Sequence, residues 1–265
     1  MQTAWRDLAF DDDDAIALVV AAGAHGVYVH NALAAHEGQG LWRAGRDAGL
    51  AWAGPRGNLV VVTGAEPTPA VAEQWVAAIL DARWTWRIAM GPAAIVDRLR
   101  ERLPVKALAC RDQVYYRGDA ASAAPGSGDV RSAGPADRNG LIQASLQLNQ
   151  ADLNVDPARV DRRWLRDAID ERIAADATRV IGAPGAVRCK LDLGSVGPGG
   201  TVIEGVFTFP QFRGQGLATD LVATVLHEIR GPAILHVGRH NRPARAAYER
   251  AGMQEVGGCR LLLLP

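Results

Sequence analysis

The sequence predicts an α+β fold of the α/β class, in which a mixed, mostly antiparallel sheet is flanked by helices. Two observations lead to this prediction. Short apolar runs typical of strands alternate with helical patterns along the 265 residues. In the second half, one strand and two helices are followed by three successive strands, and then by helix, strand, helix and strand, an order that fits a sheet with helices on its faces.

A run of small residues divides the chain. Residues 118–128 are rich in Gly, Ala and Ser and show no apolar periodicity, which is typical of a linker. The length suits one large or two ordinary domains. We therefore expect an N-terminal domain over residues 1–118, a linker over 119–128 and a C-terminal domain over 129–265.

The first half alternates helix and strand signals. The acidic residues at 11–14 complement the dipole of a helix that begins there, and Gly54 to Gly57 form the turn of a predicted hairpin. The predicted helices cover residues 15–22, 30–37, 69–81 and 91–103. The predicted strands cover residues 50–52, 59–63, 84–89 and 107–116.

The second half supplies the elements of one further sheet. The predicted helices cover residues 135–149, 156–175, 216–230 and 241–251. The predicted strands cover residues 130–133, 178–181, 188–193, 202–208, 232–237 and 260–264.

Composition narrows the class of protein. Lys plus Arg equals Asp plus Glu at 29 each, so no net charge draws the chain to nucleic acid or to a membrane surface. Its longest apolar runs are too short to span a bilayer, and residues 1–7 lack the basic start of a secretory signal. The three cysteines and six histidines show neither disulfide nor metal spacing. We expect a cytoplasmic protein without a bound metal.

The most informative segment is the Gly-rich stretch from Phe209 to Thr219, between a predicted strand and a predicted helix. Backbone N–H groups at a helix start, aided by the helix dipole, favour a phosphate or pyrophosphate. No Lys follows the glycines, which excludes a P-loop. The segment also lacks the third Gly and the acidic residue of a dinucleotide-binding loop.

Two motifs resemble the GNAT superfamily of acyl-CoA-dependent N-acyltransferases. Arg213, Gly216 and Ala218 match the family's acetyl-CoA loop in register. Downstream, Asn241 opens a predicted helix that carries Tyr248 seven positions later and ends before Gly-Met. The resemblance covers residues 129–265. It implies the GNAT fold, acetyl-CoA as co-substrate, and two central strands that splay apart where CoA enters.

The resemblance also implies roles for individual residues. Asn241 would steady the pantetheine arm, and Tyr248 would be the general acid that protonates the leaving thiolate. Two sets of residues would hold CoA. Strand residues Phe207, Thr208 and Phe209 would pair with the pantetheine amides, and Arg213, Gly214, Gln215, Gly216, Leu217, Ala218 and Thr219 would bind the pyrophosphate.

The general base and the acceptor are less defined by the motifs. Glu204, in mid-strand, is the leading candidate for the base, because acidic residues are disfavoured in strand interiors. Asp192 and a water chain are alternatives. The acceptor expected from the family is the primary amine of a small molecule or an amino-acid-like compound. Oligomeric state is left open.

The first half is similar to the degenerate N-terminal copy of two-copy GNAT proteins, in particular at residues 91–96. The leading interpretation is therefore an acetyl-CoA-dependent N-acetyltransferase of two tandem copies. A CoA-binding regulator or scaffold without turnover is the alternative. A nucleotide-binding domain is a third class, which competition by ATP or NAD would reveal.

Overall fold

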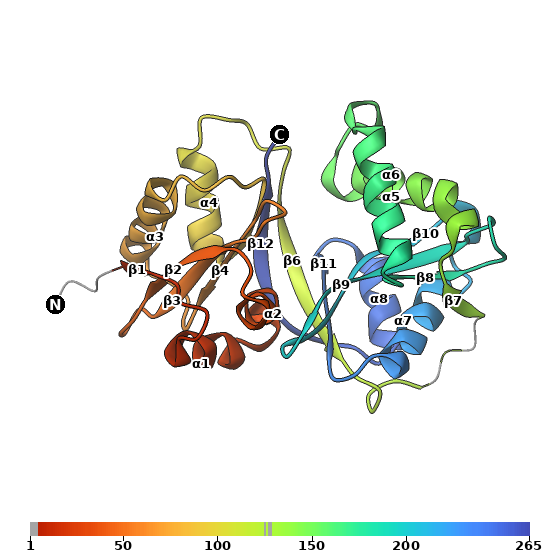
Figure 1. Cartoon of the computed structure of the whole chain (residues 1–265), viewed down its shortest axis with the longest axis horizontal. Helices are drawn as coiled ribbons and strands as arrows, with labels where there is room; N and C mark the ends of the chain where they lie inside the picture. Colours follow the sequence, from red (N-terminus) through yellow and green to blue (C-terminus); the bar gives the residue numbers. More distant parts are fainter. Residues whose placement is uncertain (1–4, 125, 127–128) are drawn as a thin grey trace. The chain divides into compact units, whose positions relative to one another are not determined.

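The computed structural model describes residues 5–124, 126 and 129–265, which form two compact units (Figure 1). The first unit takes the chain up to Tyr115 together with Gly197–Gly199 and Gly257–Pro265; the second takes Tyr116–Val196 and Gly200–Val256. The chain thus returns to the first unit at its last nine residues. Residues 125, 127 and 128 of the expected linker, and the start of the N-terminal segment judged not to be a signal, lie outside the described residues.

The first unit is a mixed sheet with helices on both faces. Its strands run β1-β2-β3-β4-β5-β12, and every neighbouring pair is antiparallel except β4 and β5, which are parallel. The strand bounds are β1 Trp5–Asp7, β2 Gln39–Arg43, β3 Gly49–Ala53, β4 Asn58–Thr63, β5 Ile88–Gly91 and β12 Gln254–Leu263.

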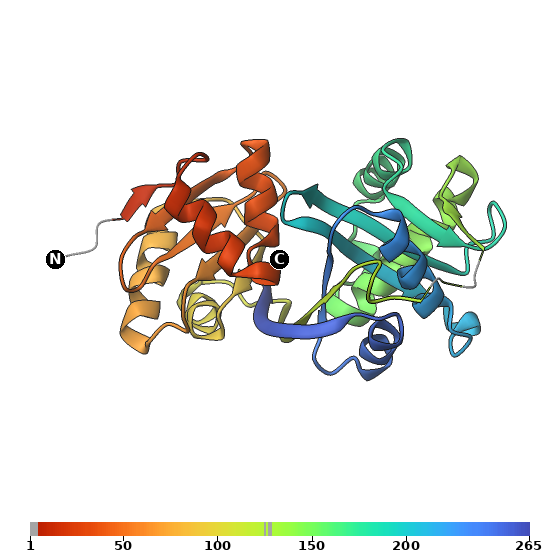
Figure 2. The same cartoon turned by 90° about the horizontal axis from the view of Figure 1, so that it is seen from below.

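The helices of this unit form two layers, with α3 and α4 on one face of the sheet and α1 and α2 on the other (Figures 1 and 2). Side chains from α3, α4 and the β3–β5 strands meet in one core, where Trp75 and Leu99 are fully buried. The bounds are α1 Asp13–Ala21, η1 Gly23–His25, α2 Val27–Ala35, α3 Pro69–Asp81 and α4 Ala93–Arg102.

The second unit repeats this plan. Its neighbouring strands run β11-β10-β9-β8-β7; β10 and β11 are parallel, and the β7–β8 and β8–β9 pairs are antiparallel. Helices α5 and α6 pack on β8 through a core that includes Leu141, Ile169 and Val180. The bounds are β7 Val130–Ser132, η2 Pro135–Asp137, α5 Arg138–Leu153, η3 Pro157–Arg159, α6 Arg162–Ala174, β8 Thr178–Ile181, β9 Cys189–Gly197, β10 Gly200–Thr208, η4 Pro210–Phe212, α7 Leu217–Glu228, β11 Ala233–Gly238 and α8 Arg242–Arg250. Strand β6, Ala109–Gly118, carries the chain from one unit to the next.

Each unit contains one pair of parallel strands that pair only briefly. In the second unit the register between β10 and β11 covers Thr201–Val202 and stops, although β10 continues to Thr208. In the first unit the register between β4 and β5 ends at Val60. The expected divergence of two central strands is therefore present in the second unit, and it has a counterpart in the first.

The mixed, mostly antiparallel sheet flanked by helices confirms the predicted fold class. Some predicted elements were wrong. Strands β1 and β2 were missed. The helix predicted over residues 156–175 is broken, because Asp161 caps a new helix by accepting hydrogen bonds from Arg163 and Trp164 N–H. The last strand begins at Gln254 instead of residue 260.

Candidate active site

The N-terminus of α7 is open and carries no side-chain cap. Gly214 and Gly216 have positive φ angles of 76° and 79°, which a residue with a side chain rarely adopts. An added Cβ at either glycine would meet no atom within 4 Å, so the space in front of the helix is free. The first N–H groups of α7, at Leu217, Ala218 and Thr219, have no partner within the helix. This turn therefore presents N–H donors and the positive end of a helix dipole to an anion.

Side chains of the loop are held back against the sheet. Arg188 donates to Gln215 Oε1 at 2.6 Å, and its guanidinium lies 4.9 Å from the Phe212 ring centre. Arg213 Nε donates to the Thr208 carbonyl at 3.2 Å. These contacts fix the loop from both sides while leaving residues 213–216 exposed.

The end of β10 lies next to this loop. Phe207 is buried, and its ring meets that of Phe209 edge to face at 5.2 Å. Thr208 Oγ1 lies 3.2 Å from Cys189 Sγ on β9. All three residues follow the point where β10 parts from β11, so this stretch of strand is available on its β11 side.

Helix α8 begins as predicted. Asn241 is the N-cap, and its Oδ1 accepts from Ala244 N–H at 3.3 Å. Thr219 Oγ1 on α7 donates to the Ala247 carbonyl at 3.2 Å. The two helices that carry the predicted CoA-binding and acid residues are thus joined directly.

Tyr248 on α8 is buried, with 5% of its surface exposed, and its ring lies 5.8 Å from that of Tyr116. Burial raises the pKa of the Tyr248 hydroxyl, and the nearby carboxylate of Asp152 and the Cys189 thiol add to the increase. The hydroxyl is therefore protonated at neutral pH and can donate a hydrogen bond.

Glu204 lies in an ion network at the interior of β10. Its Oε2 is 3.8 Å from Arg172 Nη2, and its side chain is 32% exposed. Arg172 Nη1 also donates to Asp192 Oδ2 at 3.2 Å. Because Gly194 has no side chain, the Glu204 carboxylate can lie against β9; an added Cβ there would come within 2.5 Å of it.

Asp192, the alternative base, is buried and surrounded by donors. Besides Arg172, it accepts from Thr178 Oγ1 at 2.8 Å and from Lys190 Nζ at 2.5 Å. Gly205, with φ of 56°, leaves the space for this pair, since a Cβ would lie 2.7 Å from Lys190 Nζ. A carboxylate that is already paired and shielded in this way is poorly suited to accept a substrate proton.

Two contacts bring some of the predicted residues close together within the second unit. Thr219 on α7 donates to the Ala247 carbonyl on α8, and Cys189 contacts Thr208 and helps to raise the pKa of Tyr248. Sequence reasoning missed Arg172, Cys189 and Tyr116. No local pattern distinguishes them, since their importance arises from neighbours that lie far away in the sequence.

Residues 151–253 match the sequence model of the acetyltransferase (GNAT) family. These residues form a GNAT domain. Nearly all of the GNAT domain lies within the second unit, and it includes Tyr248, Glu204 and the Gly-rich loop. The GNAT family consists of acyl-CoA-dependent acetyltransferases. No curated protein sequence matches the chain.

Solved structures resemble the whole chain in fold. A Drosophila protein has a TM-score of 0.66 at 12% identity and covers 99% of each chain. The GCN5-related N-acetyltransferase from Sphaerobacter thermophilus has a TM-score of 0.56 at 17% identity, covering 99% of this chain and 96% of its own. A GNAT-family acetyltransferase from Colwellia psychrerythraea has a TM-score of 0.52 at 11% identity, and the match covers 99% of this chain and 100% of its own. At these identities the likeness shows the fold alone.

Residues 5–124, 126 and 129–265 lack two further features. They contain no group of three or more His, Cys, Asp or Glu side chains arranged to hold a metal ion. Within the same residues, no helix has both the length and the apolar content to cross a bilayer.

Proposed function

We propose that the chain is an N-acetyltransferase that transfers an acetyl group from acetyl-CoA to the primary amine of a small or amino-acid-like molecule. The observation that carries this proposal is the uncapped, Gly-rich N-terminus of α7 at the end of a strand that has left its parallel neighbour. The family match over residues 151–253 supports the acetyl-CoA donor. The acceptor is our inference from the family resemblance.

In this proposal the CoA pyrophosphate binds the N–H groups of residues 214–219. The exposed loop offers these donors without a competing carboxylate cap. The pantetheine amides pair with residues 207–209, at the end of β10 and just beyond it, as an added strand would. Asn241 holds the arm at the start of α8 while its Oδ1 caps the helix.

The reaction needs a neutral amine and a stabilised leaving group. The amine nitrogen attacks the thioester carbonyl carbon, the C–S bond breaks, and the ammonium proton passes to Glu204 or to water. The raised pKa of Tyr248 keeps its hydroxyl protonated but makes full proton loss to a thiolate with a pKa of about 8.5 unfavourable. Tyr248 therefore acts in our proposal by donating a hydrogen bond to the sulfur as it leaves, and the thiolate then takes up the proton that the amine released to Glu204 or to water.

Arg172 contacts the proposed base, Glu204, and also its neighbour Asp192. Its guanidinium is shared between Asp192, at 3.2 Å, and Glu204, at 3.8 Å. Glu204, which is about one-third exposed, can contact the amine of an acceptor and accept its proton. This arrangement supports an amine acceptor over an alcohol.

The alternative function is CoA binding without turnover. Intact Arg213, Gly216, Asn241 and Tyr248 favour catalysis over this alternative. The two are separated by measuring acetyl-CoA binding and CoA release on the full chain with a broad panel of amines. Binding together with CoA release is expected; binding with no release from any amine would favour the regulator.

Replacing Tyr248 tests the mechanism. We expect Tyr248→Phe to lower kcat about 100-fold and to leave the Kd for acetyl-CoA within about twofold, because only the hydroxyl is removed. Tyr116→Phe is the matched control, since the hydroxyl of this adjacent tyrosine donates to Glu249 at 2.7 Å instead. Equal activity of the Tyr248→Phe and wild-type proteins would remove Tyr248 from the reaction.

We further propose that the first unit is a degenerate copy of the same fold. Both units contain a strand followed by a helix, a parallel strand and a second helix: β4-α3-β5-α4 in the first and β10-α7-β11-α8 in the second. The shared order and the shared strand divergence support duplication. Residues 91–96, which suggested this relation in the sequence, lie at the end of β5 and the start of α4.

A further inference from the structure

The first unit contains a cavity of about 210 Å³ that the proposed acetyl transfer does not use. Every residue that lines it belongs to this unit. It opens where β4 leaves β5, beyond the last paired residues Val60 and Met90. The lining residues are His25, Val60, Val61, Val62, Thr63, Ala65, Glu66, Met90, Gly91, Pro92, Tyr115, Gly258 and Cys259.

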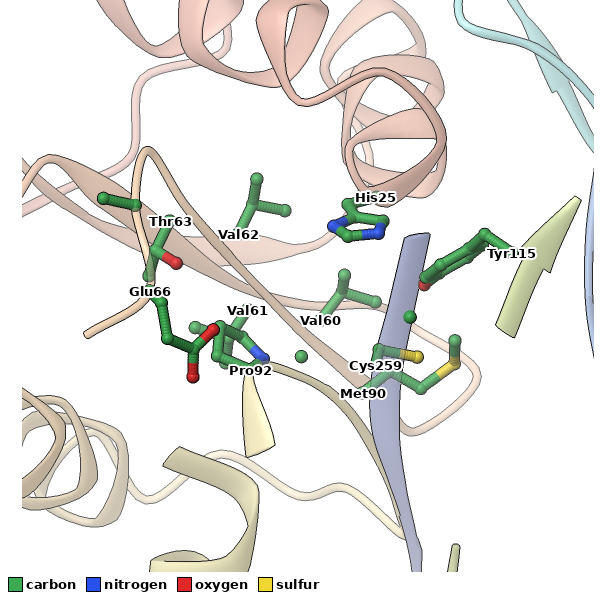
Figure 3. Close-up of a pocket in the computed structure, with 13 residues that line it drawn as sticks. His25, Val60, Val61, Val62, Thr63, Glu66, Met90, Pro92, Tyr115 and Cys259 are labelled. Atoms are coloured by element: carbon green, nitrogen blue, oxygen red, sulfur yellow. The ribbon is translucent and has the colours of Figure 1, made fainter. Parts of the chain in front are cut away.

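The two ends of the cavity differ in chemistry. Figure 3 shows Thr63 and Glu66 at one end, His25, Tyr115 and Cys259 at the other, and valine side chains between them. The volume corresponds to about seven water molecules at 30 Å³ each. A ligand that suits this lining would have an apolar body and a polar group at the Glu66 end.

The end formed by His25 is polar and uncharged. Burial lowers the pKa of His25, and it raises the pKa of Cys259 to about 11. The His25 ring centre lies 4.7 Å from that of Tyr115. Among the described residues, His25 Nε2 is buried without a hydrogen-bond partner. A buried polar atom of this kind is normally satisfied, so it offers an unused hydrogen bond to a ligand.

The end formed by Glu66 is negative. The lining contains no Lys or Arg, so Glu66 is its one charged side chain at neutral pH. Glu66 itself is exposed at the mouth. The nearby start of α3 has few free N–H donors for an anion. Thr68 Oγ1 accepts from Val71 N–H, and the prolines at 67 and 69 have no N–H. The cavity thus disfavours carboxylates and phosphates.

We propose that this cavity binds a small primary amine, with its ammonium at Glu66, its apolar body against the β4 valines and its far end at His25. The site is separate from the proposed acetyl-transfer site, and it needs no acyl-CoA. It would therefore exist even if the proposed function were wrong.

The test uses the full chain and three probes of similar size: n-butylamine, butan-1-ol and butyrate. Titration calorimetry without acyl-CoA is expected to show saturable binding of n-butylamine, about fivefold tighter than of butan-1-ol, and weaker still for butyrate. In ¹³C-labelled protein, the His25 imidazole signal, assigned with His25→Gln, is expected to shift on addition of n-butylamine. Equal affinity for the three probes, or an unmoved His25 signal, would overturn the proposal.

Variants identify which site the amine occupies. Glu66→Gln is expected to weaken the binding of n-butylamine about fivefold, to the affinity of butan-1-ol. Ala65→Trp, at an exposed position of the mouth, is expected to block the probe. Glu37→Gln, an exposed acid of the same unit outside the cavity lining, and Glu204→Gln, in the second unit, are expected to leave this binding unchanged. Loss of binding in Glu204→Gln but not in Glu66→Gln would place the amine in the second unit and refute the proposal.

Discussion

The loops that follow β4 and β10 occupy equivalent places in the two units, yet one leads into a capped helix and the other into an uncapped helix. Each lies after a strand that leaves its parallel neighbour and before a helix. In the first unit, Thr68 caps α3 and two prolines flank it. In the second, two glycines with positive φ precede an uncapped α7.

This contrast teaches that the strand divergence alone does not select a ligand. A capped helix start satisfies its own N–H groups, whereas an uncapped one needs an outside acceptor. The first unit retains a cavity at the divergence, lined by one carboxylate and uncharged groups. In our two proposals the same framework serves two kinds of ligand, and the loop after the diverging strand decides which.

The largest expected effect tests the framework of the second unit. Asp137 is fully buried and accepts two hydrogen bonds from Arg131, at 2.7 and 2.8 Å, and one each from Gly134 and Gly185 N–H at 2.9 Å. Asp137→Ala should lower the free energy of unfolding by about 3 kcal/mol, because buried donors lose their acceptor. Urea unfolding followed by circular dichroism measures it, with the exposed Asp167→Asn as control.

The same residue predicts a dependence on pH. Arg131, with help from the two N–H donors, lowers the pKa of Asp137 from 3.8 to about 2. The ionised Asp137 carboxylate adds about 2 kcal/mol to the free energy of unfolding. This stabilisation is complete above about pH 4, the pKa in the unfolded state, and is lost as the pH falls through about 2. The gap between wild type and Asp137→Ala should therefore narrow between pH 4 and pH 2. A constant gap would mean that the carboxylate charge is not what stabilises this unit.

The next effect breaks the contrast between the loops directly. Gly216→Asp places a carboxylate at the open helix start. There it should repel the pyrophosphate and accept hydrogen bonds from the free N–H groups. We expect acetyl-CoA affinity to fall about 100-fold, equivalent to about 2.7 kcal/mol. Calorimetry with acetyl-CoA measures the change.

Gly231→Asp is the matched control for backbone strain. Gly231 lies beyond the other end of α7, has φ of 77°, and would also place a Cβ in open space. Its affinity for acetyl-CoA should match wild type. A similar loss in both variants would show that strain, and not the helix start, explains the effect.

The smallest effect lies in the first unit. Thr68→Ala removes the hydroxyl that accepts from Val71 N–H at 3.4 Å, and it should cost about 1 kcal/mol of stability. It should leave acetyl-CoA binding unchanged, because the prolines at 67 and 69 and Glu66 still disfavour an anion. New binding of a second acetyl-CoA in this variant would show that the cap alone separates the two loops.

Much of the fold could be predicted because its signals are local. The hairpin of β3 and β4, the helix at Pro69 and the capped helix at Asn241 depend on turn residues and caps that are contiguous in sequence. Strand β1 was missed because three residues are too few for periodicity. The break before Asp161 was missed because two helices in sequence share one apolar pattern across a short gap.

The candidate site was predictable where motifs are contiguous, and not where tertiary pairing decides. The loop and the Asn–Tyr helix are visible in the sequence. The partnership of Glu204 with Arg172 is not, because they lie on β10 and α6 and meet only after folding. The paired state of Asp192 likewise depends on Lys190 and Thr178, whose side chains show no motif.

The last strand has a consequence for the order of synthesis. Residues 260–263 pair with β5, about 170 positions earlier in the chain. The first unit, though it is translated first, therefore cannot complete its sheet until nearly all of the second unit has left the ribosome. During that interval the edge of β5 lacks this partner, and pairings between residues so far apart form slowly. The first unit therefore completes its sheet last, after the second unit has been synthesised.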